Sequence, residues 1–202
     1  MSQRPWDFHS DLSRDRLQLI AEILRHVRRD AVRRHDPAIF ETSWTLGCSI
    51  YGRSAEMLAR VGGELWDWFR VIQPPLEFVF SVGQVPMRFC RDDPDHPEGQ
   101  HLRVTEAEYR QYEFVFGSHS VDLIWRIVVA ANPAGETDSV VVIGASPSGD
   151  VHCKYVIPEL DGGIAFLTGP LSPRTGAGVE LPAPVVKPRL LKSQKRSDDE
   201  GI

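Results

Sequence analysis

The sequence predicts an α+β protein in which N-terminal helices pack on an antiparallel sheet. Two observations support this fold class. Near the start of the chain, apolar residues recur at helical spacing up to about residue 34. Residues 76–157 then read, in order, as a β-hairpin, a helix and a three-stranded β-meander. One of the expected strands is apolar on both faces, so a helix is expected to lie across the sheet.

The first element is a helix over about residues 13–34. Its apolar residues recur at steps of three and four and form a stripe that faces the core: Leu17, Ile20, Leu24, Val27 and Ala31. The opposite face is predicted to be charged, either as a solvated surface or as a site for an acidic partner. Its basic side chains gather toward the C-terminal end, where cations complement the helix dipole: Arg25, Arg28, Arg29, Arg33 and Arg34.

Two shorter helices are expected before the sheet begins. One covers about residues 54–60 and ends at Gly62 and Gly63. The other covers residues 64–72 and ends before Pro74. Aromatic residues are dense in this region, and this density is more typical of a core than of a ligand cage.

The hairpin consists of residues 76–82 and 85–91, joined by Gly83 and Gln84. Glycine at the first central position fits a type II′ turn. Alternation places the apolar side chains of both strands on one face: Phe78, Phe80, Val82, Met87 and Phe89. Pro86 has no N–H to donate, so the second strand is predicted to lie at a sheet edge.

A helix and three strands complete the predicted domain. Thr105 is a candidate N-cap for a helix over residues 106–116, which Gly117 is expected to end. The strands are expected at residues 123–131, 139–145 and 151–157, with turn-rich connections. The middle strand is apolar at every position from 140 to 143, so it is predicted to be an interior strand.

Composition indicates one domain and a cytoplasmic protein. The chain has 202 residues, of which 42% are hydrophobic and 25% charged. We expect a tail over residues 1–10, a domain over 11–168, and a Pro/Gly-rich basic tail over 169–202. Cys48, Cys90 and Cys153 are odd in number and widely spaced, which favours free thiols in a reducing compartment. No segment approaches about eighteen continuous apolar residues, so no membrane partner is expected.

Charge is distributed unevenly along the chain. The net charge is −5. Residues 1–35 and 170–202 carry a small basic excess, whereas the body between them has nine basic and nineteen acidic residues. A protein partner is therefore expected at the basic ends, with only weak nucleic-acid binding. The candidate partner-binding residues are Arg25, Arg28, Arg29, Arg33, Lys187, Arg189, Lys192, Lys195 and Arg196.

One loop between the hairpin and the next helix is rich in metal-ligand types. Cysteine and histidine suit zinc, and carboxylates suit magnesium or manganese. The candidates beside Cys90 and Glu98 are Asp92, Asp93, Asp95, His96 and His101. Their spacing matches no defined site, and the prolines and glycine of this loop already explain an acidic surface turn. We therefore expect no metal and no cofactor.

No catalytic constellation is visible in the sequence. His152 and Lys154 share a strand face near Asp150, but the acid-x-Lys pattern of metal-dependent nucleases is absent. Residues 118–122 hold serine, histidine and aspartate that are adjacent and so cannot converge as a triad. Phosphate-loop, dinucleotide and zincin motifs are also missing.

The order of the predicted elements resembles two cupped α+β architectures, the NTF2-like cone and the PAS-like sensor fold. This resemblance places a ligand on the concave sheet face under the helices, with Trp44, Trp66, Phe78 and Trp125 as candidate lining. The leading hypothesis is a non-enzymatic binding or accessory protein; the alternatives are a small pocket enzyme or ligand sensor, and a nucleic-acid binder. A deep cavity with at least two convergent polar side chains would favour the second class.

Overall fold

The computed structural model describes residues 3–74, 77–116, 123–132 and 134–160. The chain divides into two compact units, Met1–Thr168 and Gly169–Ile202, and every described residue belongs to the first. The expected C-terminal tail and its basic side chains lie outside the described residues. So do Gly117, expected to end a helix, and residues 118–122.

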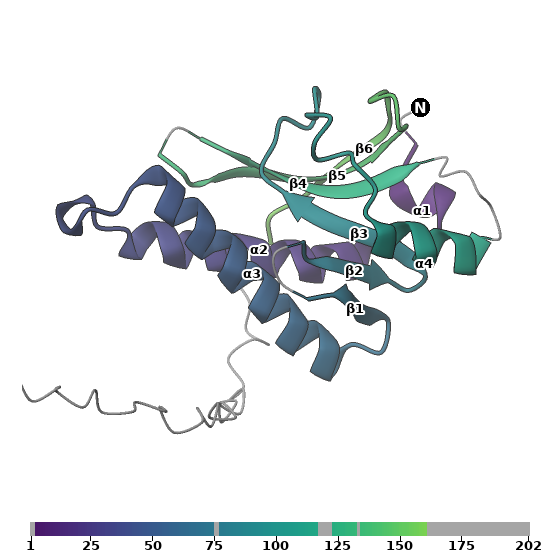
Figure 1. The fold of residues 1–202 in the computed structure, drawn as a ribbon, viewed down its shortest axis with the longest axis horizontal. Helices are drawn as coiled ribbons and strands as arrows, with labels where there is room; N and C mark the ends of the chain where they lie inside the picture. Colours follow the sequence, from purple (N-terminus) through teal and green to yellow (C-terminus); the bar gives the residue numbers. More distant parts are fainter. Residues whose placement is uncertain (1–2, 75–76, 117–122, 133, 161–202) are drawn as a thin grey trace, which may run out of the picture. The chain divides into compact units, whose positions relative to one another are not determined.

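The fold is α+β, with helices followed by a six-stranded, mostly antiparallel sheet. Its strands are β1 (Phe69–Gln73), β2 (Val79–Val82), β3 (Val85–Cys90), β4 (Ile124–Ala131), β5 (Thr137–Ala145) and β6 (Val151–Ile157). They follow one another across the sheet in chain order, from β6 at the top of Figure 1 to β1 at the bottom. Only the β3–β4 pair is parallel within the described sheet, and α4 (Glu106–Phe116) lies between these strands in the chain.

Helices α2 (Arg14–Arg34) and α3 (Ser43–Leu65) cover one face of the sheet. The predicted apolar stripe of α2 is confirmed, because its five residues are all buried. The cross-strand register places Phe89, Ile127, Val129, Val142 and Val140 on this same face. A short helix, α1 (Pro5–Phe8), precedes α2, and a 3-10 turn, η1 (Pro37–Ile39), joins α2 to α3.

The opposite face is covered by α4 and by the loop of residues 91–105. Leu102 of this loop packs on Ile124 and Ala145. Strand β5 lies between β4 and β6, and residues 140–143 are all buried, as predicted for an interior strand. The turn between β2 and β3 is also confirmed, since Gly83 has φ +59° and a Cβ there would lie 2.1 Å from the Asp11 carboxylate carbon.

Three predictions about elements are wrong. Helix α3 is one long helix, and it passes through Gly62 and Gly63 instead of ending there. Residues 64–72 do not form a third helix, because Phe69 and Val71 alternate inward and pair with Val82 and Phe80 as strand β1. A glycine is needed at position 62, since a Cβ would lie 2.5 Å from the ring of Phe69.

The predicted edge position of β3 is the third error. This strand lies between β2 and β4. Pro86 is tolerated because it pairs with Ser81 of β2, while the register with β4 begins one residue later, at Met87. Its missing N–H therefore removes no hydrogen bond from the parallel pair.

Candidate functional site

A cavity of about 280 Å³ lies between α2, α3 and one end of the sheet, and it is partly open to solvent. Its apolar lining comes from both layers: Leu24, Leu46, Ile50, Phe89 and Val129. Six polar or basic side chains also line it: Arg28, His35, Ser43, Tyr51, Ser54 and Arg91. The α3 residues recur at steps of three and four, so one face of this helix forms a wall.

Arg28 is the unusual member of this lining. Its side chain is only 5% exposed, and Nη1 donates to the carbonyl of Gly135 at 2.7 Å. The buried Nε has no hydrogen-bond partner, and no described carboxylate forms an ion pair with this guanidinium. Burial, and then the charge of Arg91, lower the pKa of Arg28. An unpaired buried charge costs several kcal/mol, so this arginine needs an explanation.

Arg25, one turn earlier on the same helix, provides the contrast. It is as buried as Arg28, but it pairs with Glu22 at 2.7 Å and donates to the carbonyl of Pro158 at 3.1 Å. It also donates to the carbonyl of Ile157. The fold therefore supplies this buried arginine with one carboxylate and two carbonyl partners.

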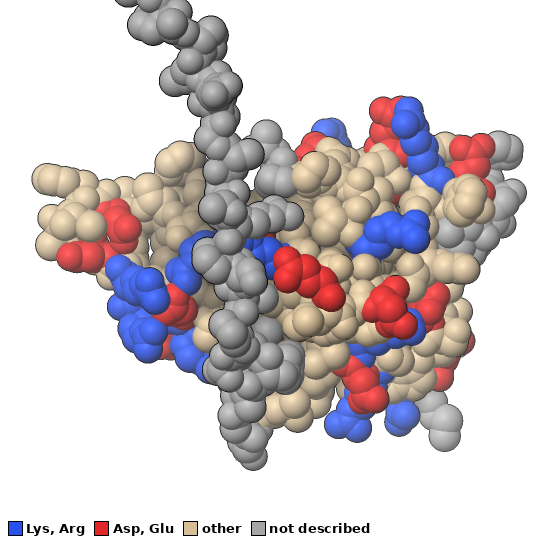
Figure 2. Space-filling view, turned by 90° about the horizontal axis from the view of Figure 1, so that it is seen from below, with Lys and Arg blue, Asp and Glu red and all other residues tan. Residues whose placement is uncertain are grey.

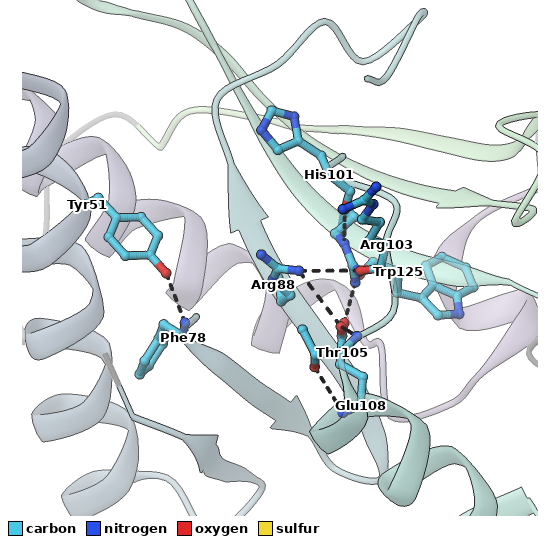
Figure 3. Close-up of polar contacts among 9 residues, drawn as sticks. Tyr51, Phe78, Arg88, His101, Arg103, Thr105, Glu108 and Trp125 are labelled. Carbon is cyan, nitrogen blue, oxygen red and sulfur yellow. Dashed lines mark hydrogen bonds and ion pairs between the residues drawn. The ribbon is translucent and has the colours of Figure 1, made fainter. Parts of the chain in front are cut away.

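Two rim residues are held in place by neighbours. The ring of Tyr51 packs on Phe89 with centroids 5.2 Å apart, and its hydroxyl accepts the backbone N–H of Phe78 at 2.9 Å (Figure 3). The His35 Nδ1 lies 3.0 Å from Glu41 Oε2. These contacts make the rim a preformed part of the fold.

On the other face of the sheet, a buried ion pair joins α4 to β4. Arg126 Nη1 lies 2.6 Å from Glu108 Oε1, and both side chains are almost fully buried. The remaining donors of Arg126 reach the carbonyls of His101, Arg103 and Trp125 (Figure 3). Glu108 also accepts the N–H of Thr105, whose hydroxyl accepts the N–H of Glu108, so the predicted cap is confirmed as a capping box. Both charged groups of this cluster, the Arg126 guanidinium and the Glu108 carboxylate, have hydrogen-bond partners, so the cluster acts as a structural clamp.

The acidic loop brings together part of the predicted ligand set. Donor atoms of Cys90, Asp92 and His101 lie within 4.8 Å of one another. The Asp92 carboxylate already accepts the N–H groups of Asp93 and Glu98, and its Oδ2 lies 2.8 Å from His101 Nδ1. Burial, and then Asp92, raise the pKa of the Cys90 thiol to about 12. Through these contacts Asp92 holds the loop in its conformation.

The other metal candidates lie apart from this group. His96 is exposed and faces Asp93 at 3.5 Å, and Asp95 forms an ion pair with Lys154 across to β6. Asp150 accepts a hydrogen bond from Ser148 within the β5–β6 turn, and the ion pair of Lys154 is with Asp95. That the loop holds no metal stays a prediction.

The aromatic residues expected to line a pocket lie elsewhere. Trp44 is 75% exposed, and Trp66 stacks on Trp68. Phe78 is buried in the core, and Trp125 is fully buried against the ring of Phe8. The sequence places a ligand under the helices, but it did not reveal Arg28 as part of the lining, because this residue was assigned to the charged face. The spacing of Arg28 could have predicted its burial, because this residue lies four residues after Leu24 and three before Ala31, at the edge of the apolar stripe.

The basic face of α2 is smaller than the sequence predicts. Arg25 and Arg28 are buried, which removes them from the solvated face. The exposed arginines are paired: Arg29 with Glu159, and both Arg33 and Arg34 with Asp30. In Figure 2 basic side chains gather at the left, toward the end of α2, with acidic side chains beside them.

Comparisons with known proteins do not extend these observations. No family model, curated protein or solved structure gives a match to this chain. Within the described residues, no helix has the length and apolar character needed to cross a membrane.

Proposed function

We propose that this protein is a non-enzymatic binding protein that holds a small molecule in the cavity between α2, α3 and the sheet. The observation that carries the proposal is the cavity itself, with apolar walls from two layers and several polar side chains converging on it. By the criterion derived from the sequence, such a cavity favours the second class, a small pocket enzyme or ligand sensor, over a purely protein-binding accessory role.

The chemistry of the lining favours binding over catalysis. A catalytic nucleophile needs a base within hydrogen-bond reach. Within the described residues, no hydrogen bond joins His35 to a serine or cysteine of the lining, and its Nδ1 is engaged with Glu41. The raised pKa of Cys90 keeps that thiol protonated. The three cysteines are free, which supports the further proposal of a cytoplasmic location.

A glycine in the cavity wall allows a direct test. Gly47 lines the cavity, and a Cβ built on it meets no atom within 4 Å. We expect Gly47→Leu to keep the fold and fill the cavity. Gly52 lies in the same helix, equally free of neighbours and outside the lining, so Gly52→Leu is the matched control.

The probe is octanol, a small neutral amphiphile, titrated against labelled protein and followed by NMR. We expect the original protein and Gly52→Leu to bind it with a dissociation constant of about 1 mM or tighter, with shifts at Ile50 and Val129. Gly47→Leu should weaken binding at least about tenfold, because its side chain occupies the same space. Equal binding of octanol by Gly47→Leu and by the original protein would contradict the proposal, and so would failure of the original protein to bind both octanol and its carboxylate analogue octanoate.

A further inference from the structure

We infer that the ligand of this cavity is an anion with an apolar body, and that its carboxylate pairs with Arg28. This inference rests on the proposed function and names the class of ligand. It follows from three features of the site: an arginine without a counterion, an unpaired Nε on its guanidinium, and a wall that combines apolar side chains with no acidic one.

The missing counterion is the first feature. An arginine stays protonated in a protein, so Arg28 carries its charge into a site where it is nine-tenths buried or more. No aspartate or glutamate is among the described residues of the lining, and Arg91 adds further positive charge. Asp30, the nearest acid along α2, is already engaged by Arg33, Arg34 and Arg53.

The comparison with Arg25 shows that this lack is specific to Arg28. Both arginines lie on α2 and are equally buried, yet Arg25 has Glu22 within 2.7 Å. The fold therefore supplies a carboxylate where it buries one arginine and supplies none where it buries the other. A ligand carboxylate would form an ion pair with Arg28 in the way that Glu22 does with Arg25.

The second feature is the orientation of the guanidinium. Nη1 is held by the carbonyl of Gly135 in the β4–β5 turn, which fixes the plane of the group. Nε is buried without a partner, and Nη2 makes no hydrogen bond to a described residue. These two N–H groups point the same way and form the fork that binds both oxygens of a carboxylate. A planar anion that reaches this edge from the cavity would bind through both N–H groups.

The third feature is the wall beyond the arginine. Leu24, Ile50, Phe89 and Val129 are apolar, and they come from both helices and from the sheet. The volume of about 280 Å³ lies near the lower limit for small-molecule sites. A short aliphatic or a single-ring carboxylic acid fits this volume and this chemistry.

Octanoate and octanol test the inference, because they share an alkyl chain and differ in the charged end. At neutral pH and low salt, the original protein should bind octanoate at least tenfold tighter than octanol, measured by calorimetry or NMR. A tenfold difference corresponds to about 1.4 kcal/mol. Arg28→Met should lose at least tenfold in octanoate affinity and bind the two probes equally.

Arg29→Met is the control, because Arg29 is exposed on the same helix, pairs with Glu159 and does not line the cavity. It should retain the preference for octanoate. Equal affinity of the original protein for the two probes would overturn the inference while leaving the proposed function standing. If neither probe binds, or if Gly47→Leu binds both unchanged, the proposed function fails instead. If Arg28→Met does not fold, the affinities of the original protein for octanoate and octanol still decide whether the cavity prefers an anion.

Discussion

Arg126 and Arg28 show how differently a buried arginine can be used in one small protein. The guanidinium of Arg126 donates to three carbonyls and to the carboxylate of Glu108. Burial lowers the pKa of Arg126, while Glu108 raises it and so favours the charged form. A fully paired group of this kind holds the helix and the acidic loop on the sheet, whereas the incomplete pairing of Arg28 is the basis of the proposed ligand site.

Removal of one partner of this pair should strongly destabilise the fold. We expect Glu108→Ala to lower the free energy of unfolding by about 3–5 kcal/mol, because it leaves the charge of Arg126 buried and unpaired. Urea denaturation measures the change. Glu106→Ala is the control: its ion pair with Arg110 is exposed, so its effect should stay within about 0.5 kcal/mol. Equal effects of the two substitutions would show that the buried pair is not a clamp.

Helix α3 shows that tertiary packing can override a local signal for the end of a helix. Two adjacent glycines near its end were expected to stop it, yet the helix continues to Leu65. Position 62 faces the ring of Phe69 in β1, and position 63 faces solvent. Tertiary packing of one glycine therefore overrides the local preference of both.

The two glycines should respond in opposite directions to alanine. Gly63→Ala should raise the free energy of unfolding by roughly 0.5–1 kcal/mol, because alanine favours the helix and its Cβ meets no atom within 4 Å. Gly62→Ala should lower it, because its Cβ would lie 2.5 Å from the buried ring of Phe69. Thermal unfolding of both variants tests this. Stabilisation by Gly62→Ala would show that β1 does not pack against the helix in this way.

At the scale of the whole molecule, charge argues against nucleic acid as the main partner. Of the arginines on the predicted basic face of α2, two are buried and three form ion pairs with Asp30 or Glu159. A phosphate backbone would therefore meet both positive and negative charges on the exposed face of α2. The body between the two basic ends carries an acidic excess, which repels phosphate.

We expect the full chain to bind a short DNA duplex more weakly than about 1 μM at about 0.15 M salt. A fluorescence titration at several salt concentrations measures both the affinity and the number of phosphates neutralised. Micromolar or tighter binding that is lost when Arg29, Arg33, Lys192, Lys195 and Arg196 become alanine would refute this expectation. Such a result would place nucleic acid ahead of a small molecule as the ligand.

The sequence by itself determined the class of fold and most of its elements. Periodicity identified α2, α4 and the strands β2 to β6, because burial of one face or of both faces leaves a regular pattern of apolar residues. The Gly83 turn and the Thr105 cap were equally readable, since each depends on residues close together in the chain. These features are local, so one sequence is sufficient to predict them.

Only the tertiary structure decided the features that depend on distant partners. In the structure, residues 69–73 form a strand and β3 lies between two other strands. Arg25 and Arg28, which the sequence had assigned to the surface, are buried. An arginine on a helix looks the same in sequence whether it faces water, a glutamate or a cavity. Whether its charge meets a carboxylate depends on how α2, α3 and the sheet pack around it, and that packing is a property of the whole fold.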